Sequence, residues 1–299
     1  MKIKGKVFLA PMAGVTVMPF RVLCRKYGAD YVCTEMINAI ALSRRNKATL
    51  KMLEHCEEER PVGAQLFGAN TESIIKSAKM IKDDFDFIDF NLGCPSISVM
   101  KSGAGAALLK RKNKIEEIVS KLVKIGKPVM VKIRIGPDAR HINAVEICKM
   151  LDELGLSAIT IHGRNAKQGY RDEADWEIIQ QVKREVKTPI IGNGDIFSRK
   201  DAVKRLKISD GIMIGRGAIG NPGIFREIKN GKEYNNTEKI DDFLSIAEQL
   251  DDKSIKIQAN YFTKGIAKSR IFREKINSGD RKEIIMLMKK LKKELQVGS

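Results

Sequence analysis

The sequence of 299 residues predicts an α/β protein: a (β/α)8 TIM barrel followed by a small C-terminal helical domain. Two observations support this prediction. Eight short β-rich runs alternate with amphipathic helical patterns over roughly the first 230 residues, and the remaining residues show helical periodicity alone. A doubly wound open sheet has the same alternation, because periodicity does not prove that a sheet closes.

The eight candidate strands are rich in β-branched and aromatic residues. They cover residues 6–10, 31–35, 62–67, 87–91, 129–134, 158–162, 189–193 and 211–215. The segments between them repeat apolar residues at spacings of three and four, which predicts helices over 71–81, 114–125, 144–154, 175–186 and 198–207. Thr71, Asp175 and Ser198 are expected to cap the helices that they open.

A change of pattern near residue 232 predicts a domain boundary. Residues 1–232 form the predicted barrel domain and residues 238–299 the predicted helical domain, which ends in the lysine-rich stretch MLMKKLKKELQ. The polar residues between them are expected to form a linker.

The chain carries a formal net charge of +18 at pH 7, and this charge is unevenly distributed. Residues 253–299 contain 13 Lys and Arg against 4 Asp and Glu, a local excess of +9. A concentrated positive field attracts polyanions, of which nucleic acid is the most common. A lysine-rich surface adapted to high temperature is the alternative explanation.

Several classes of protein are disfavoured by composition. No apolar run approaches the ~18 residues of a membrane span, and the first residues lack the core of a signal peptide. The five cysteines are odd in number and form no CxxC pair, which argues against a disulfide framework and a zinc site. We therefore expect a cytoplasmic protein with no metal and no membrane contact.

Chemically versatile residues gather where the predicted strands end, and the active sites of such barrels lie at those ends. In strand order they are PMAG (11–14), Glu35, Gln65, NLGCP (91–95), Lys132 with Arg134, HGR (162–164), NGD (193–195) and GRG (215–217). A barrel with a purely structural role does not need such residues at all eight ends. The pattern therefore predicts an active site.

The loops after the last two strands predict a phosphate site. Glycine-rich turns that open onto helices present free N–H groups and the positive end of the helix dipole, and Arg216 adds a charged donor. Gly215, Gly217 and Gly220 also match the dinucleotide fingerprint G-x-G-x-x-G. That fingerprint requires a further strand, which the sequence lacks, so we reject a dinucleotide-binding fold.

Cys94 lies on a constrained turn just after the fourth predicted strand, whereas Cys24 and Cys148 lie among apolar neighbours on predicted helices. A thiol at a strand end can donate a proton or attack as a thiolate. His162, at the end of the sixth strand, would serve as the base for attack. Spacing leaves both roles open.

Lys132 and Arg134 share one face of the fifth predicted strand, because side chains alternate along a strand. Two cations that point into a barrel mouth need an anion or a polarised ring beside them. Alternatively, Lys132 and Arg134 lie at a solvated loop edge and have no ligand.

At these positions the chain resembles the tRNA-dihydrouridine synthases. The motifs that carry the resemblance are APMAGVT (10–16), GAQLFG (63–68), DFNLGCP (89–95), VKIRIG (131–136), HGRNAKQGYRDEADW (162–176), IIGNGDI (190–196) and GIMIGRGAIGNPGIF (211–225). Dihydroorotate-type flavin barrels are similar at NLGCP, but the later motifs are specific as a set. They cover nearly the whole predicted barrel, in order.

The resemblance implies an FMN-dependent oxidoreductase that reduces the C5=C6 bond of specific uridines in tRNA, with NADPH as reductant. It implies that hydride passes from flavin N5 to C6, and that Cys94, as a neutral thiol, gives the proton to C5. The residues that it implies for flavin binding are Pro11, Met12, Ala13, Gln65, Lys132, His162, Asn193, Gly194, Asp195, Gly215 and Arg216. Asn91, Arg134 and Lys101 are the candidates for substrate contacts.

The basic helical domain is expected to hold the tRNA body while the target base leaves its stack. We expect a monomer that needs no protein partner. One rival is an FMN barrel that reduces a small pyrimidine, which would not need the basic tail. The other is a tRNA-binding protein without catalytic activity, against which Cys94, Lys132 and His162 argue.

Overall fold

The computed structural model describes residues 1–267 and 269–297, and its centre is a sheet of eight parallel strands. The strands are β1 (Lys6–Leu9), β2 (Val32–Asn38), β3 (Val62–Phe67), β4 (Phe87–Leu92), β5 (Val129–Arg134), β6 (Ala158–His162), β7 (Ile190–Asn193) and β8 (Gly211–Ile214). Each predicted strand is present, with ends that differ by at most a few residues.

The sheet closes into a barrel. Its strand order runs β1-β8-β7-β6-β5-β4-β3-β2, so β1 and β2 are the two ends that must meet. They meet at a parallel bridge between Phe8 and Tyr31. On either side of this bridge Leu9 N–H donates to Tyr31 O at 3.0 Å and Asp30 N–H to Val7 O at 2.8 Å. This closure confirms the barrel and excludes the open sheet.

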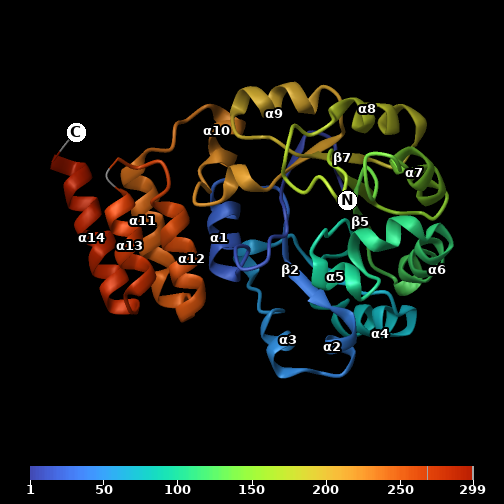
Figure 1. Cartoon of the computed structure of the whole chain (residues 1–299), viewed down its shortest axis with the longest axis horizontal. Coiled ribbons are helices and arrows are strands. Elements are labelled where there is room, and N and C mark those ends of the chain that lie inside the picture. The colour runs from blue at the N-terminus through green and yellow to red at the C-terminus, as the bar shows by residue number, and fades with distance from the viewer. Residues whose placement is uncertain (268, 298–299) are drawn as a thin grey trace.

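Helices surround the barrel, as Figure 1 shows. They are α1 (Met18–Lys26), α2 (Ala39–Ser43), α3 (Lys47–Lys51), α4 (Thr71–Ile81), α5 (Ile97–Lys101), α6 (Lys112–Leu122), α7 (Ala144–Asp152), α8 (Trp176–Glu185), α9 (Arg199–Leu206) and α10 (Ile224–Asn230). Asp175 and Ser198 cap α8 and α9 as predicted. The cap of α4 is Asn70, not Thr71, because the Asn70 side chain accepts from Ser73 N–H.

The C-terminal residues form four helices that lie together at one side of the barrel, next to α1 (Figure 1). They are α11 (Asn236–Ile246), α12 (Asp252–Phe262), α13 (Ser269–Ser278) and α14 (Arg281–Val297). Gln258 on α12 donates to Val15 O at 2.8 Å, and the rings of Phe262 and Phe20 meet edge to face. None of the described helices combines the length and the apolar content that a membrane crossing needs.

The interior of the barrel is apolar in part and polar at its carboxyl end. Every second residue of a strand points inward. The apolar cluster inside the barrel consists of Ile3, Phe8, Ala10, Cys33, Phe87, Met130, Ala158, Ile191 and Met213, most of them from the first halves of their strands. Closer to the carboxyl ends of the strands come Gln65, Asp89, Asn91, Lys132, Thr160, His162 and Asn193. These polar side chains lie beneath the strand ends, where the sequence predicts the active site.

A buried ion pair fixes α1 to the segment before β3. The Arg21 Nε and Nη2 atoms donate to the two carboxylate oxygens of Glu59, at 2.5 and 2.9 Å. Its Nη1 and Nη2 groups also donate to the carbonyls of Thr16 at 2.8 Å and Glu54 at 2.7 Å. Glu59 is fully buried, so the loss of one partner would leave the other charge without compensation.

We predict that Glu59→Gln lowers the free energy of unfolding by about 3–5 kcal/mol, because Arg21 then remains charged and buried. Urea unfolding followed by circular dichroism measures this change. Glu57→Gln is the matched control, because Glu57 pairs with Arg60 at 2.9 Å but is 83% exposed. The control substitution should lower the free energy of unfolding by less than about 1 kcal/mol. Equal costs for the two substitutions would show that burial of the Arg21–Glu59 pair does not set its contribution to stability.

Candidate active site

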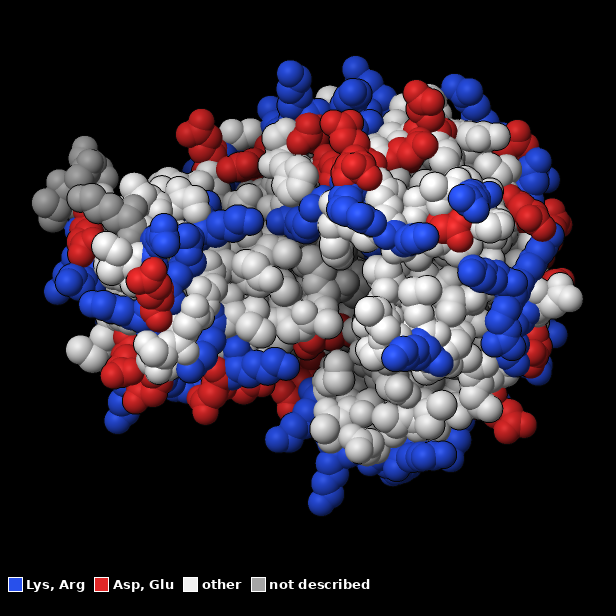
Figure 2. Space-filling model, in the orientation of Figure 1, with Lys and Arg blue, Asp and Glu red and all other residues white. Residues whose placement is uncertain are grey.

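A cavity of about 1190 Å³ opens at the carboxyl ends of the strands. Figure 2 shows this face hollowed near its centre, with Lys and Arg side chains along the rim. The cavity brings together most of the predicted site residues: Pro11, Met12, Ala13, Asn91, Cys94, Lys132, Arg134, His162, Asn193, Gly194, Asp195, Gly215 and Arg216. Two predicted residues do not line it. Gln65 is fully buried beneath it, and Lys101 is exposed at the end of α5.

The cavity is strongly cationic. Its charged lining residues are Lys132, Arg134, Arg216, Lys239 and Lys264 against the carboxylate of Asp195. Asp195 is itself committed to two arginines. The cavity therefore suits an anionic ligand.

Two of these cations come from the C-terminal helices. Lys239 lies in the first turn of α11 and Lys264 just after α12, and Tyr261 of α12 lines the same wall. The helices therefore complete the cavity as well as packing against the barrel.

Asn91 holds the turn that carries Cys94. Its Oδ1 accepts from Gly93 N–H at 3.1 Å and from Cys94 N–H at 2.8 Å. The Cys94 carbonyl in turn accepts from Ala106 N–H at 3.0 Å. The half-buried Cys94 is thereby fixed at the cavity wall.

Gln65 supports Asn91 from below. Its Oε1 accepts from Asn91 Nδ2 at 2.9 Å, and its Nε2 donates to Asp89 Oδ2 at 2.6 Å. The Asn91 amide is thus engaged at both ends within the protein. Gln65 and Asn91 therefore act on the site through the position of Cys94.

Lys132 and Asp89 titrate away from their ordinary ranges. Burial lowers the pKa of Lys132 to about 8, with a further contribution from Arg134, while Asp89 and Cys94 oppose the change. Burial raises the pKa of Asp89 to about 6, although Gln65 and Lys132 lower it in part. Lys132 makes no hydrogen bond or ion pair with any described residue, so its ammonium is free for a ligand.

His162 is held in the neutral form. Burial lowers its pKa strongly, and the nearby Lys132 and Arg134 lower it further. Its Nδ1 atom is buried without a partner among the described residues. A neutral imidazole with an unpaired nitrogen at a cavity wall suits a polar ligand edge.

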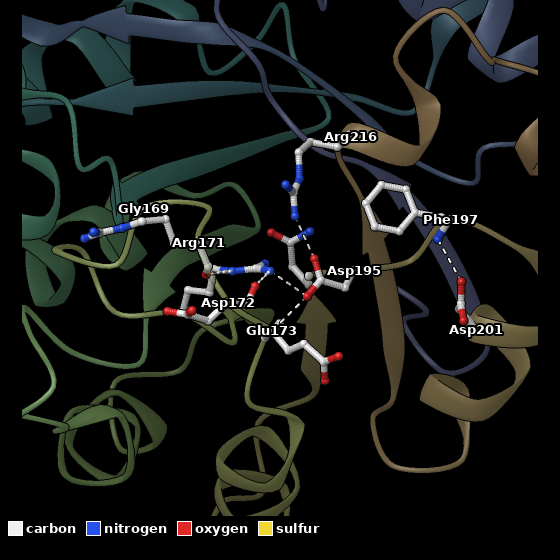
Figure 3. A network of polar contacts seen from close by, with 12 residues as sticks. Gly169, Arg171, Asp172, Glu173, Asp195, Phe197, Asp201 and Arg216 are labelled. Carbon is white, nitrogen blue, oxygen red and sulfur yellow. Dashed lines mark hydrogen bonds and ion pairs between the residues drawn. The ribbon is translucent and has the colours of Figure 1, made fainter. Parts of the chain in front are cut away.

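Asp195 organises the loops after β6, β7 and β8. Its two carboxylate oxygens accept from Arg164 and Arg216, each at 2.7 Å, and Oδ2 also accepts from Ala174 N–H at 2.7 Å. Figure 3 shows Asp195 facing Arg216. Burial would raise the pKa of Asp195, but the Ala174 amide and the Arg164 guanidinium outweigh it and keep the pKa below its usual range.

Arg134 ties two loops together. Its Nε donates to Gly93 O at 3.0 Å, beside Cys94, and its Nη1 donates to Asn165 O at 3.0 Å and Gly169 O at 2.8 Å. These bonds leave the Nη2 amino group for a ligand. Arg134 therefore both joins the two loops and offers a hydrogen-bond donor at the mouth of the cavity.

The glycines of the loop after β8 are required by packing. A Cβ atom on Gly217 would lie 2.2 Å from Ile196 O, in the loop after β7. Gly220 has φ +63°, and a Cβ there would lie 2.3 Å from Tyr261 O on α12. Helices alone follow β8 in the described chain, which agrees with the rejection of a dinucleotide-binding unit.

The other cysteines lie away from the cavity. Cys24 and Cys148 are fully buried on α1 and α7, as predicted, and burial raises the pKa of both thiols. Cys33 is buried inside the barrel and Cys56 is half-buried outside it.

Some lining residues cannot be found from the sequence patterns alone. Tyr170, Phe197, Lys239 and Lys264 belong to this group. Arg164 does not line the cavity but is the buried partner of Asp195. The motif HGR contains Arg164 and offers a usable signal. The two lysines lie among many others in a basic chain, so no pattern distinguishes them.

Solved structures with low sequence identity share the fold. A histamine dehydrogenase from Rhizobium sp. 4-9 has a TM-score of 0.56 at 14% identity, over 76% of this chain and 46% of the other. The old yellow enzyme homologue from Zymomonas mobilis has a TM-score of 0.53 at 13% identity, over 77% and 90%. At such identities the likeness concerns the fold alone.

Relatives with similar sequences are more informative. The chain is 36% identical over 285 residues to the probable tRNA-dihydrouridine synthase of Aquifex aeolicus, covering 89% of each chain. It is 37% identical over 233 residues to tRNA-dihydrouridine synthase B of Pasteurella multocida, covering 77% of this chain and 70% of that one. Residues 8–290 match the family model of dihydrouridine synthase (Dus). The chain therefore belongs to the dihydrouridine synthase family.

Proposed function

We propose that the protein reduces the C5=C6 bond of uridine in tRNA, with FMN as bound cofactor and NADPH as reductant. The observation that carries this proposal is the cation-lined cavity in which Cys94 lies with Lys132 and His162. Membership of the dihydrouridine synthase family gives the substrate class.

The residues of the cavity fit FMN. The free ammonium of Lys132 and the unpaired Nδ1 of His162 suit the polar edge of an isoalloxazine ring. Pro11, Met12 and Ala13 offer an apolar wall for the ring. The loops after β7 and β8 would hold the phosphate through Asn193, Gly194, Gly215 and Arg216, with Asp195 orienting Arg216.

Cys94 supplies the proton in this scheme. Bound FMN, once reduced by NADPH, would supply the hydride for C6 of the uracil. The Cys94 S–H bond breaks as a C–H bond forms at C5, and the thiolate then recovers a proton from solvent. Asn91 and Gln65 hold the turn that places Cys94 at the cavity wall, and Lys132 offers positive charge beside it.

The uracil edge would meet the Nη2 group of Arg134, which makes no hydrogen bond to any described residue. The target base must leave its stack to enter a cavity at the mouth of the barrel. Lys239, Lys264 and the basic C-terminal helices would attract the tRNA backbone, and the exposed Lys101 would meet a phosphate outside the cavity.

Residues 1–232 would act as the catalytic domain and 238–299 as the tRNA-binding domain. The protein would work as a cytoplasmic monomer without a protein partner.

Incubation of dihydrouridine-free tRNA with the protein, FMN and NADPH should convert a uridine to a nucleoside two mass units heavier. Mass spectrometry of the digested nucleosides detects this product. Cys94→Ala should lower the rate by about 10²–10⁴-fold, because the proton donor is lost. Cys56→Ala, which changes a half-buried cysteine outside the cavity, should keep the rate of the parent protein.

The same experiment separates the rival function. If the flavin-loaded protein leaves tRNA unchanged but reduces a small pyrimidine, the synthase function is wrong. The protein is then a reductase of the dihydroorotate type. An undiminished rate in Cys94→Ala would remove Cys94 as the proton donor.

The affinity of the apoprotein for FMN should fall as pH rises through about 8. The pKa of Lys132, about 8, lies below its ordinary value, so the attracting positive charge is present below pH 8 and lost above it. Quenching of FMN fluorescence between pH 6.5 and 9.5 should show a loss of about tenfold. Lys132→Met should bind weakly at every pH. A flat profile for the parent protein, or an equal fall in the variant, would contradict the role of Lys132.

A further inference from the structure

Two exposed aromatic rings stand at the rim of the cavity. Tyr170 is 59% exposed and Phe197 is 51% exposed, and both line the cavity. In the part of the chain that the structure describes, they are the two Phe, Tyr or Trp side chains that are more than half exposed. Their shared location at one mouth distinguishes them from scattered apolar residues on a surface.

The two rings flank one cation. The guanidinium carbon of Arg216 lies 4.9 Å from the centre of the Tyr170 ring and 5.5 Å from that of Phe197. Figure 3 shows Phe197 beside Arg216. Arg134 adds a second guanidinium 5.6 Å from the Tyr170 ring. We name Tyr170, Arg216 and Phe197 the aromatic shelf.

Hydrogen bonds fix the backbone on which both rings are carried. On the Tyr170 side, Arg134 Nη1 donates to Gly169 O at 2.8 Å and Arg164 Nε donates to Arg171 O at 3.0 Å. On the other side, Phe197 N–H donates to Asp201 Oδ2 at 3.1 Å (Figure 3). The backbone of the shelf is therefore fixed and its rings lie around Arg216, which lowers the entropic cost of binding.

We propose that the aromatic shelf is a nucleobase-binding site. Unstacked bases bind to aromatic rings and to arginine planes, and every base has a face that can stack in this way. The proposal rests on the proposed function, which brings two sources of a base to this cavity. One source is the nucleotide beside the target uridine in tRNA, and the other is the adenine of NADPH.

The decisive variant is Tyr170→Ala/Phe197→Ala. Its dissociation constant for dihydrouridine-free tRNA, measured by fluorescence anisotropy, should rise by about tenfold or more if the base comes from tRNA. The slope of log Kd against log salt should stay unchanged, because stacking releases no counterions. If the base is adenine, the apparent Kd for NADPH in rapid reduction of the flavin without tRNA should rise by a similar factor instead. Either rise supports the site and names its ligand.

Two controls accompany this variant. Leu50→Ala/Val203→Ala removes two apolar side chains that are 40% and 46% exposed and lie outside the cavity, so it should bind like the parent protein. Tyr170→Phe/Phe197→Tyr keeps both rings and should restore binding, which loss of apolar bulk alone would not explain.

Two results would overturn the proposal. One is an unchanged affinity for both tRNA and NADPH. The other is a loss of FMN affinity together with a salt slope lower by about one, because the rings would then only position Arg216 for a phosphate. Failure of the proposed function has a separate signature, since the parent protein itself would then leave uridine unreduced.

Discussion

The carboxylate of Asp195 is the contact on which the active-site mouth depends. It pairs with Arg164 and Arg216 and accepts an amide from Ala174, so three loops after consecutive strands converge on one side chain. Arg164 is only 2% exposed and would be a buried unpaired cation without Asp195. Asp195 also has φ +50°, a backbone region that residues other than glycine seldom adopt. Its ion pairs help to hold that conformation in place.

Charge imbalance is the second property that shapes the cavity. Five cationic side chains line the cavity and repel one another, while its one carboxylate is already paired. Burial increases the electrostatic cost of this repulsion. The protein limits this cost by keeping His162 neutral and by lowering the pKa of Lys132. An anionic cofactor and a polyanionic substrate would offset the remainder. The helices that bring Lys239 and Lys264 to the same wall extend this positive field toward the molecular surface.

Much of the fold can be predicted because local patterns determine it. Strands and amphipathic helices follow from periodicity, and the strand ends of a barrel define one mouth. Closure cannot be predicted in this way, since it depends on a bridge between Phe8 and Tyr31 that no motif marks. The predicted cap of α4 is wrong by one residue because Asn70 and Thr71 are both able to cap.

The predicted site residues lie close together because the strand ends of a barrel meet at one mouth. Their hydrogen-bond and ion-pair partners, however, depend on tertiary structure. Gln65 is predicted at the flavin edge, whereas the structure places it beneath the cavity between Asp89 and Asn91. Strand alternation shows that these side chains point inward, but it does not show which of them reach the surface of the cavity. Lys239 and Lys264 cannot be predicted, because their approach depends on how the C-terminal helices pack on the loop after β8.

In the proposed function, the loops organised by Asp195 bind the phosphate of a flavin. The most direct test compares the affinities of the apoprotein and its Asp195→Asn variant for FMN and riboflavin, which differ only in the phosphate. We expect the parent protein to bind FMN at least about tenfold more tightly than riboflavin. We also expect the substitution to weaken FMN binding while riboflavin binding changes little. Equal affinity for the two flavins, or an equal loss for both in the variant, would contradict the claim.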